Sequence, residues 1–163
     1  MTILLTTAGV AAPAPHVAWL WDQQPHANLW RRPIPGMIEL ARELAARGAR
    51  VGVLSNSEGR LAELFAEIGQ ADPFTAIIDS GRIGIEKPDP RIFAHALAAL
   101  GGHDPTTAIH IGDSWPADIA GARAAGWRAI WFGRRVSPVT DPSVAIARDA
   151  AELRAALARW GVV

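Results

Sequence analysis

The sequence has no cysteine among its 163 residues. This absence excludes a disulfide framework, a thiol nucleophile, and zinc or iron–sulfur sites built on thiolates. An excess of charge is also lacking, because 16 basic residues balance 16 acidic ones, so we expect no partnership with nucleic acid or an anionic membrane. No apolar run reaches the roughly 20 residues that a membrane span requires. We therefore expect one soluble, cytoplasmic domain over residues 1–163.

The amino-terminal segment is poor in charge. No lysine or arginine precedes Arg31, so the apolar residues 3–14 lack the positive leading region of an export signal. We therefore interpret residues 3–5 as a buried first strand rather than as part of a signal peptide.

Short apolar runs alternate with helical patterns of about a dozen residues, which predicts βαβ units and a parallel sheet. The runs are nearly continuous, as expected for strands covered on both faces. They lie at residues 3–5, 51–54, 76–78, 108–111 and 129–132. This pattern predicts a doubly wound, Rossmann-like α/β fold of about five strands, with functional groups outside the carboxyl ends of the strands.

Boundary residues mark the helices between these runs. Ser57 is expected to cap one helix, and Asp89 with Pro90 forms an N-cap and first-turn pair for another. A small-residue helix is expected over residues 116–125, and residues 136–143, with two prolines, are expected to form a loop.

Polar residues occupy four places near the expected carboxyl edge of the sheet. Ser55 and Asn56 follow the second run, Lys87 precedes a helix, Asp113 follows the fourth run, and Asp118 lies in the next helix's first turn. Because strand ends share one edge of a parallel sheet, these side chains are expected to converge.

Lys87 is the only lysine, beside fifteen arginines. A solitary lysine indicates either a site that prefers a compact point charge or an ordinary solvated side chain. Asp113 and Asp118 similarly have two interpretations. Both carboxylates could face a cleft holding Mg²⁺ and the lysine, or they could be a turn residue and a helix-dipole partner.

Together these segments resemble a known family. The first segment is Val-Leu-Ser-Asn at 53–56, and the second is Glu-Lys-Pro-Asp-Pro-Arg-Ile-Phe at 86–93. The third is His-Ile-Gly-Asp-Ser at 110–114, with Asp118 and residues 121–126. In this order they resemble motifs two, three and four of the haloacid dehalogenase superfamily, phosphatase type. Their order and spacing match that family, and the resemblance extends from about Pro33 to the end of the chain.

The resemblance implies a Rossmann-like sheet that binds Mg²⁺ and hydrolyses a small phosphorylated molecule. By resemblance, Ser55 and Asn56 hold the phosphoryl group, Lys87 neutralises its charge, Asp113 ligates Mg²⁺, and Asp118 orients Lys87 or supports the metal. These roles are physically sensible, because phosphoryl transfer depends above all on positioning and charge neutralisation.

The first motif departs from the family. In the family an Asp at the end of the first strand attacks phosphorus, and a second Asp two residues later acts as general acid and base. Here Thr6 stands at the first position and Ala8 at the second. A phosphothreonine ester would persist, and the hydroxyl needs a base that the sequence does not place nearby. Losing this Asp also removes a Mg²⁺ ligand.

Three hypotheses explain the departure. In the first hypothesis, the chain is a catalytically inactive pseudoenzyme that binds a phosphorylated ligand or a protein. In the second, the family's amino-terminal part is missing, which leaves residues 11–32 as a vestigial cap or flap. In the third, residues 17–21 are the first strand and Asp22 is the nucleophile.

Three of the seven tryptophans, Trp19, Trp21 and Trp30, fall close together. They would either complete the core or form a homodimer interface, where aromatic residues are enriched. His110 lies inside an expected strand, and we interpret it as a core residue rather than a catalyst.

Overall fold

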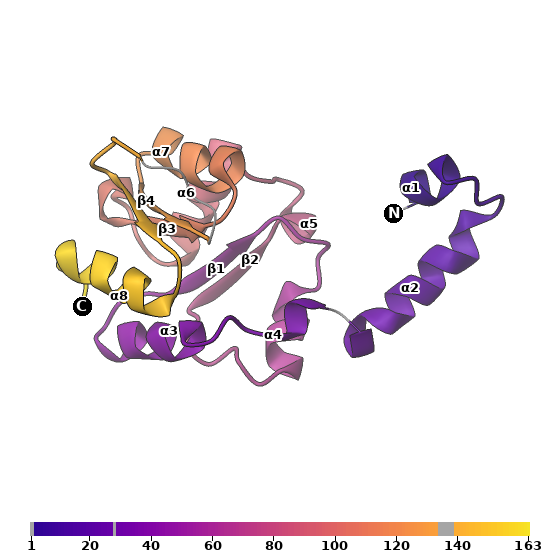
Figure 1. The fold of residues 1–163 in the computed structure, drawn as a ribbon, viewed down its shortest axis with the longest axis horizontal. Helices are drawn as coiled ribbons and strands as arrows, with labels where there is room; N and C mark the ends of the chain where they lie inside the picture. The colour runs from indigo at the N-terminus through magenta and orange to yellow at the C-terminus, as the bar shows by residue number, and fades with distance from the viewer. Residues whose placement is uncertain (1, 28, 134–138) are drawn as a thin grey trace. The chain divides into compact units, whose positions relative to one another are not determined.

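The computed structural model describes residues 2–27, 29–133 and 139–163 (Figure 1). The chain divides into two compact units, Met1–Pro33 and Ile34–Val163. The first unit holds α1 (Thr2–Thr7), α2 (Pro13–Ala27) and the 3-10 turn η1 (Leu29–Arg31). Among the described residues, no helix is long and apolar enough to cross a membrane.

The second unit alternates strands and helices. Its strands are β1 (Gly52–Ser55), β2 (Ala76–Asp79), β3 (Ile109–Gly112), β4 (Arg128–Phe132) and β5 (Val144–Ala147). Its helices are α3 (Met37–Ala46), α4 (Leu61–Glu67), α5 (Ser80–Ile83), α6 (Pro90–Ala99), α7 (Gly121–Ala124) and α8 (Ala150–Arg159), with the 3-10 turn η2 (Pro105–Thr107) and the π-helical turn η3 (Trp115–Ala120). The strand pairs are parallel, which confirms the predicted Rossmann-like α/β fold.

Two apolar layers cover opposite faces of the strands. Successive side chains of a strand point to opposite faces, so Ala129 of β4 joins one layer and Ile130 joins the other. The first layer centres on Phe93 of α6, and the second brings Leu44 of α3 together with Leu157 of α8. Helices therefore bury both faces, which explains why the strands are continuous apolar runs in the sequence.

Four of the expected strands correspond to β1 through β4. The structure adds β5, which the sequence reading missed because a four-residue run is too short for its periodicity to separate strand from helix. Of the expected loop at 136–143, residues 139–143 lack regular structure, and residues 136–138 lie outside the described part of the chain.

Two expected strands are wrong. Residues 3–5 lie in α1, and residues 17–21, the alternative first strand, lie in α2. A strand needs a neighbour to satisfy its backbone groups, whereas a helix satisfies them internally. Pro13 also suits the first turn of α2.

The predicted cap at Ser57 is also wrong, because α4 begins at Leu61. The buried carboxylate of Asp79, at the end of β2, accepts hydrogen bonds from the backbone N–H groups of Gly59, Leu61 and Gly81. A residue from a neighbouring strand therefore replaces the local cap. Burial favours a higher pKa for Asp79, but these hydrogen bonds outweigh it and leave the pKa below its ordinary value.

The tryptophans of the first unit differ in exposure. Trp19 is 61% exposed and Trp30 is 81% exposed, so neither completes a core within that unit. Trp21 is half-buried. A homodimer through these side chains stays a prediction.

The packing around Phe93 yields a test of the core. Phe93 is completely buried and packs edge-on against His110 and Trp127. We expect Phe93→Ala to lower the free energy of unfolding by about 3–5 kcal/mol, measured by urea denaturation. The matched control His95→Ala changes an exposed position of the same helix and should cost less than about 0.5 kcal/mol. Equal losses in the two variants would contradict this account of the core.

Candidate functional site

Lys87 and Asp118 form a buried ion pair. The Lys87 side chain is 9% exposed and the Asp118 side chain 6%, and Lys87 Nζ lies 2.6 Å from Asp118 Oδ1. Lys87 Nζ also donates a hydrogen bond of 2.9 Å to the backbone oxygen of Leu54 in β1. An ammonium group has three N–H donors, so among residues 2–27, 29–133 and 139–163 these two contacts leave one N–H for a ligand.

Both carboxylate oxygens of Asp118 are occupied. Oδ1 contacts Lys87 and His110 Nε2, the latter at 2.9 Å, and Oδ2 accepts a 2.9 Å hydrogen bond from the backbone N–H of Ser114. Burial favours a higher pKa for Asp118, but the hydrogen bonds from His110, Lys87 and Ser114 outweigh it. The pKa of Asp118 therefore lies well below its usual range, and the side chain stays ionised.

His110 lies in β3 with its ring buried between Asp118 and the apolar layer of Phe93. Burial lowers the pKa of His110 from its ordinary value, and the charge of Lys87 adds to this, although Asp118 opposes it. A neutral ring whose Nε2 carries the proton donates to Asp118 Oδ1. The sequence correctly predicts a buried histidine. It does not predict the hydrogen bond to Asp118, because the two positions have no characteristic spacing.

Asn56 holds the backbone on either side of the Lys87 side chain. Its Nδ2 donates to Lys87 O at 2.9 Å, and its Oδ1 accepts from Lys87 N at 2.8 Å. Asn56 thus fixes the Lys87 backbone. Because its amide nitrogen carries two N–H donors, the expected phosphate contact of Asn56 stays a prediction. Ser55, the last residue of β1, follows Leu54 directly, so its half-buried side chain lies next in sequence to the carbonyl that binds Lys87 Nζ.

The end of β3 must pass very close to Asp118. A Cβ built on Gly112 would lie 2.3 Å from Asp118 Cγ, far inside van der Waals contact. Glycine at 112 is therefore needed for the buried carboxylate to reach both Ser114 and Lys87.

Asp113 is exposed, in contrast to Asp118. Its backbone oxygen accepts a 3.0 Å hydrogen bond from Trp131 Nε1, which ties the loop after β3 to β4. Mg²⁺ is usually held by one or two carboxylates together with waters and substrate phosphate. Asp118 has no free carboxylate oxygen, and no group of three potential ligands occurs among the described residues. The exposed Asp113 carboxylate is available as one such ligand, so the described side chains supply part of a Mg²⁺ site, and the expected ligand role of Asp113 stays a prediction.

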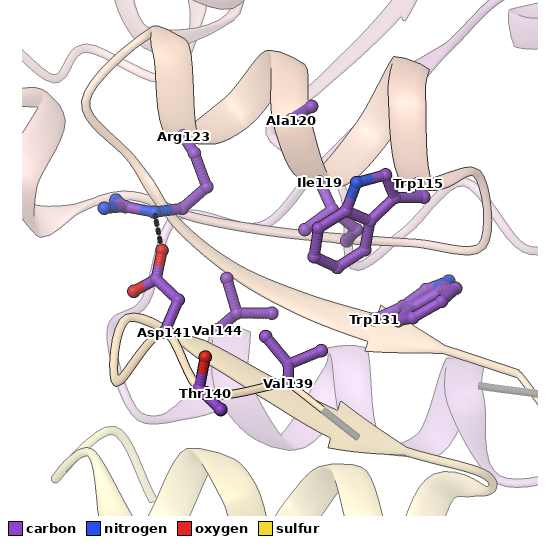
Figure 2. A pocket seen from close by; sticks show the side chains of 9 residues that line it. All are labelled: Trp115, Ile119, Ala120, Arg123, Trp131, Val139, Thr140, Asp141 and Val144. Carbon is purple, nitrogen blue, oxygen red and sulfur yellow. Dashed lines mark hydrogen bonds and ion pairs between the residues drawn. The ribbon is translucent and has the colours of Figure 1, made fainter. Parts of the chain in front are cut away.

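A separate cavity of about 530 Å³ lies beside η3 and β4 (Figure 2). The rings of Trp115 and Trp131 pack with centroids 4.8 Å apart, and Arg123 forms an ion pair with Asp141 at its edge. Lys87 and Asp118 are not among its lining residues. This cavity is therefore distinct from the ion pair.

The remaining expected site residues lie in the first unit. Thr6 is in α1, Ala8 is in the turn that follows, and Asp22 is in α2, all three exposed. The structure thus brings together Leu54, Asn56, Lys87, His110 and Asp118 within the second unit. The roles expected of Thr6, Ala8 and Asp22 stay predictions.

The buried ion pair predicts a contrast between the two acidic residues. Asp118→Asn leaves the Lys87 ammonium buried without its counter-charge, so we expect a loss of about 3–5 kcal/mol in the free energy of unfolding. Asp113→Asn changes an exposed side chain and should stay within about 0.5 kcal/mol of the parent. Urea denaturation at pH 7 measures both, and a mild effect of Asp118→Asn would contradict the burial of the pair.

His110 predicts a pH dependence of stability. Its pKa is lowered in the folded state, so the unfolded chain binds the extra proton first, below its ordinary pKa of about 6.5. Stability is therefore complete above that pH and falls as the pH drops, by at most about 1.4 kcal/mol per pH unit. We expect this fall between pH 7 and 5 to disappear in His110→Asn and to persist in His95→Asn. A slope unchanged in His110→Asn would refute the neutral ring.

Comparisons with known proteins agree with this geometry. Residues 6–126 match the model of the haloacid dehalogenase-like hydrolases. The chain is 36% identical over 135 residues to haloacid dehalogenase-like hydrolase domain-containing protein 3 of Homo sapiens, covering 82% of this chain and 53% of that protein. It is 41% identical over 101 residues to phosphoserine phosphatase of Thermus thermophilus, covering 61% of this chain and 40% of that protein.

The fold agrees with solved structures as well. A HAD phosphatase from Thermococcus onnurineus superposes with a TM-score of 0.72 at 26% identity, covering 85% of this chain and 62% of that one. The chain spans about half the length of the curated relatives it matches. The family model matches residues 6–126, which are most of this chain. This match shows that the chain belongs to the haloacid dehalogenase-like hydrolases.

Proposed function

We propose that this chain binds the phosphoryl group of a small phosphate ester at Lys87 and Ser55, and hydrolyses its P–O bond. The observation that carries the proposal is the Lys87 ammonium, which Asp118 and Leu54 fix at the strand ends. Within the described part of the chain, its third N–H has no partner. Phosphatases among the relatives, including phosphoserine phosphatase and phosphoglycolate phosphatase, support a phosphate ester as the substrate class.

Each side chain has a defined part in this proposal. The remaining N–H of Lys87 neutralises charge on a non-bridging phosphoryl oxygen, and the Ser55 hydroxyl donates to another. Asp118 and Asn56 are positioning residues, since Asp118 fixes the ammonium and Asn56 fixes the Lys87 backbone. In the net reaction, the oxygen of water becomes bonded to phosphorus, and the alcohol leaves with a proton.

We propose the attacking group from the sequence alone. No carboxylate precedes Asp22, so Asp22 is the earliest acidic side chain that could attack phosphorus. If Thr6 and Ala8 stand where the family has its two carboxylates, a second candidate function is favoured, a phosphate-binding pseudoenzyme. Both functions use Lys87 and Ser55 in the same way, and they differ only in turnover.

An assay of aryl phosphate hydrolysis distinguishes the phosphatase from the phosphate-binding pseudoenzyme. We expect measurable hydrolysis by the parent, and a kcat/KM reduced on the order of 10² in Ser55→Ala, because one phosphoryl hydrogen bond is lost. Ser143→Ala, on the loop before β5, is the control and should leave the rate unchanged.

A further variant, Asp22→Asn, assigns the attacking group. Abolished hydrolysis would identify Asp22 as the nucleophile, whereas unchanged hydrolysis would exclude it. A parent protein that binds inorganic phosphate but hydrolyses nothing would replace the enzyme by the phosphate-binding pseudoenzyme.

A further inference from the structure

Ser55 and Asp79 lie side by side at the carboxyl ends of β1 and β2. The two strands pair in parallel, and their register makes these last residues partners. The chain after β2 then runs through α5 to Lys87. The separation between the Ser55 hydroxyl and the Lys87 ammonium therefore depends in part on how the segments that follow the two strands are held together.

The Asp79 carboxylate joins these two segments. Asp79 is 2% exposed. Its Oδ1 accepts hydrogen bonds from Gly59 N at 2.9 Å and from Gly81 N at 3.0 Å, and its Oδ2 accepts from Leu61 N at 2.9 Å. Gly59 and Leu61 belong to the segment after β1, whereas Gly81 belongs to the segment after β2. One buried side chain thus binds the backbone of both.

The first turn of α5 extends this contact. Ser80 Oγ accepts from Ser57 N at 3.0 Å and donates to Ser57 O at 3.2 Å, and Arg82 Nε donates to Gly59 O at 2.8 Å. The approach is also close, because a Cβ built on Gly81 would lie 2.6 Å from Ser57 O. Hydrogen bonds therefore oppose movement of the loop away from α5, and close packing opposes movement toward it.

Asn56 carries the position of this loop to Lys87. Its side-chain amide binds both the N–H and the C=O of Lys87, at 2.8 Å and 2.9 Å. The next residue, Ser57, is held by Ser80. A loop that came free of α5 would therefore also free the Asn56 side chain, and with it the Lys87 backbone.

Helix capping alone does not explain the burial of Asp79. Asp149 caps α8 from an exposed position with one hydrogen bond, from Glu152 N. Removing a carboxylate from water costs free energy. Two of the three backbone partners of Asp79, Gly59 and Gly81, lie outside the helix that it caps. Its arrangement therefore holds two chain segments together as well as starting a helix.

We propose that Asp79 is a positioning residue for the phosphate site. Its carboxylate holds the loop after Ser55 against the segment that leads to Lys87, which keeps the serine hydroxyl and the lysine ammonium at a fixed separation. Two groups already fixed in place bind phosphate more tightly, because less ordering is required when the ligand binds. This inference rests on the proposed function, in which these two side chains share one phosphoryl group.

Asp79→Asn tests the positioning role in protein labelled with ¹⁵N-lysine, which has one lysine backbone amide. An amide side chain offers one acceptor oxygen where the carboxylate offers two, so part of the loop loses its partner. Without phosphate, hydrogen exchange at the Lys87 backbone amide should become about tenfold faster. The Kd for inorganic phosphate, followed by the lysine ammonium resonance, should rise about tenfold.

A second variant and a control accompany this measurement. Ser80→Ala keeps the carboxylate and removes the hydroxyl that binds Ser57, so it should also speed exchange at Lys87 and raise the Kd. Asp149→Ala removes the cap of α8. It should lower the thermal stability while leaving both the exchange rate at Lys87 and the Kd for phosphate unchanged.

The outcomes separate this inference from the proposed function. Exchange at Lys87 that stays unchanged in Asp79→Asn and Ser80→Ala would overturn the positioning role, whether or not phosphate binds. Faster exchange with an unchanged Kd would also overturn it, as would equal effects of Asp149→Ala. A parent protein that binds no phosphate, together with faster exchange in both variants, would overturn the proposed function and support the link from Asp79 to Lys87.

Discussion

The buried pair of Lys87 and Asp118 is the interaction on which the second unit depends. Two opposite charges out of water cost several kcal/mol in desolvation, and an apolar pair of similar size would serve packing equally well. Their presence at the strand ends is therefore better explained by a need for a fixed positive charge than by stability. Asp118, His110, Leu54 and Ser114 together hold this charge in one place.

Other features of the second unit follow from the need to hold the Lys87 charge in a fixed place. The close approach of Gly112 to Asp118 sets the end of β3, and the two hydrogen bonds of Asn56 set the backbone at Lys87. The burial of His110 keeps its ring neutral, so it adds a donor to Asp118 without adding a second charge. The contacts of Lys87 and Asp118 also connect β1 to β3, two strands that are not paired with each other in the described part of the chain.

The sequence predicts part of this arrangement and misses the rest for physical reasons. Lys87 and Asp118 could be found because residues at parallel strand ends converge. The contacts of His110 and Asp79 could not, because they join residues with no characteristic spacing. The sequence predicts a strand over residues 3–5 from their apolar content, but a short apolar run does not reveal whether a neighbouring strand exists to pair with it. That information lies in the tertiary structure, where these residues form α1.

The central claim is that the Lys87 ammonium is an anion site. Because Lys87 is the only lysine, protein labelled with ¹⁵N at lysine Nζ gives one ammonium resonance, free of overlap. Titration with inorganic phosphate should shift this resonance saturably, and the shift should weaken in Ser55→Ala and persist in Ser143→Ala. A resonance that phosphate leaves unmoved would contradict the account, because the third N–H of Lys87 would then bind no phosphoryl oxygen.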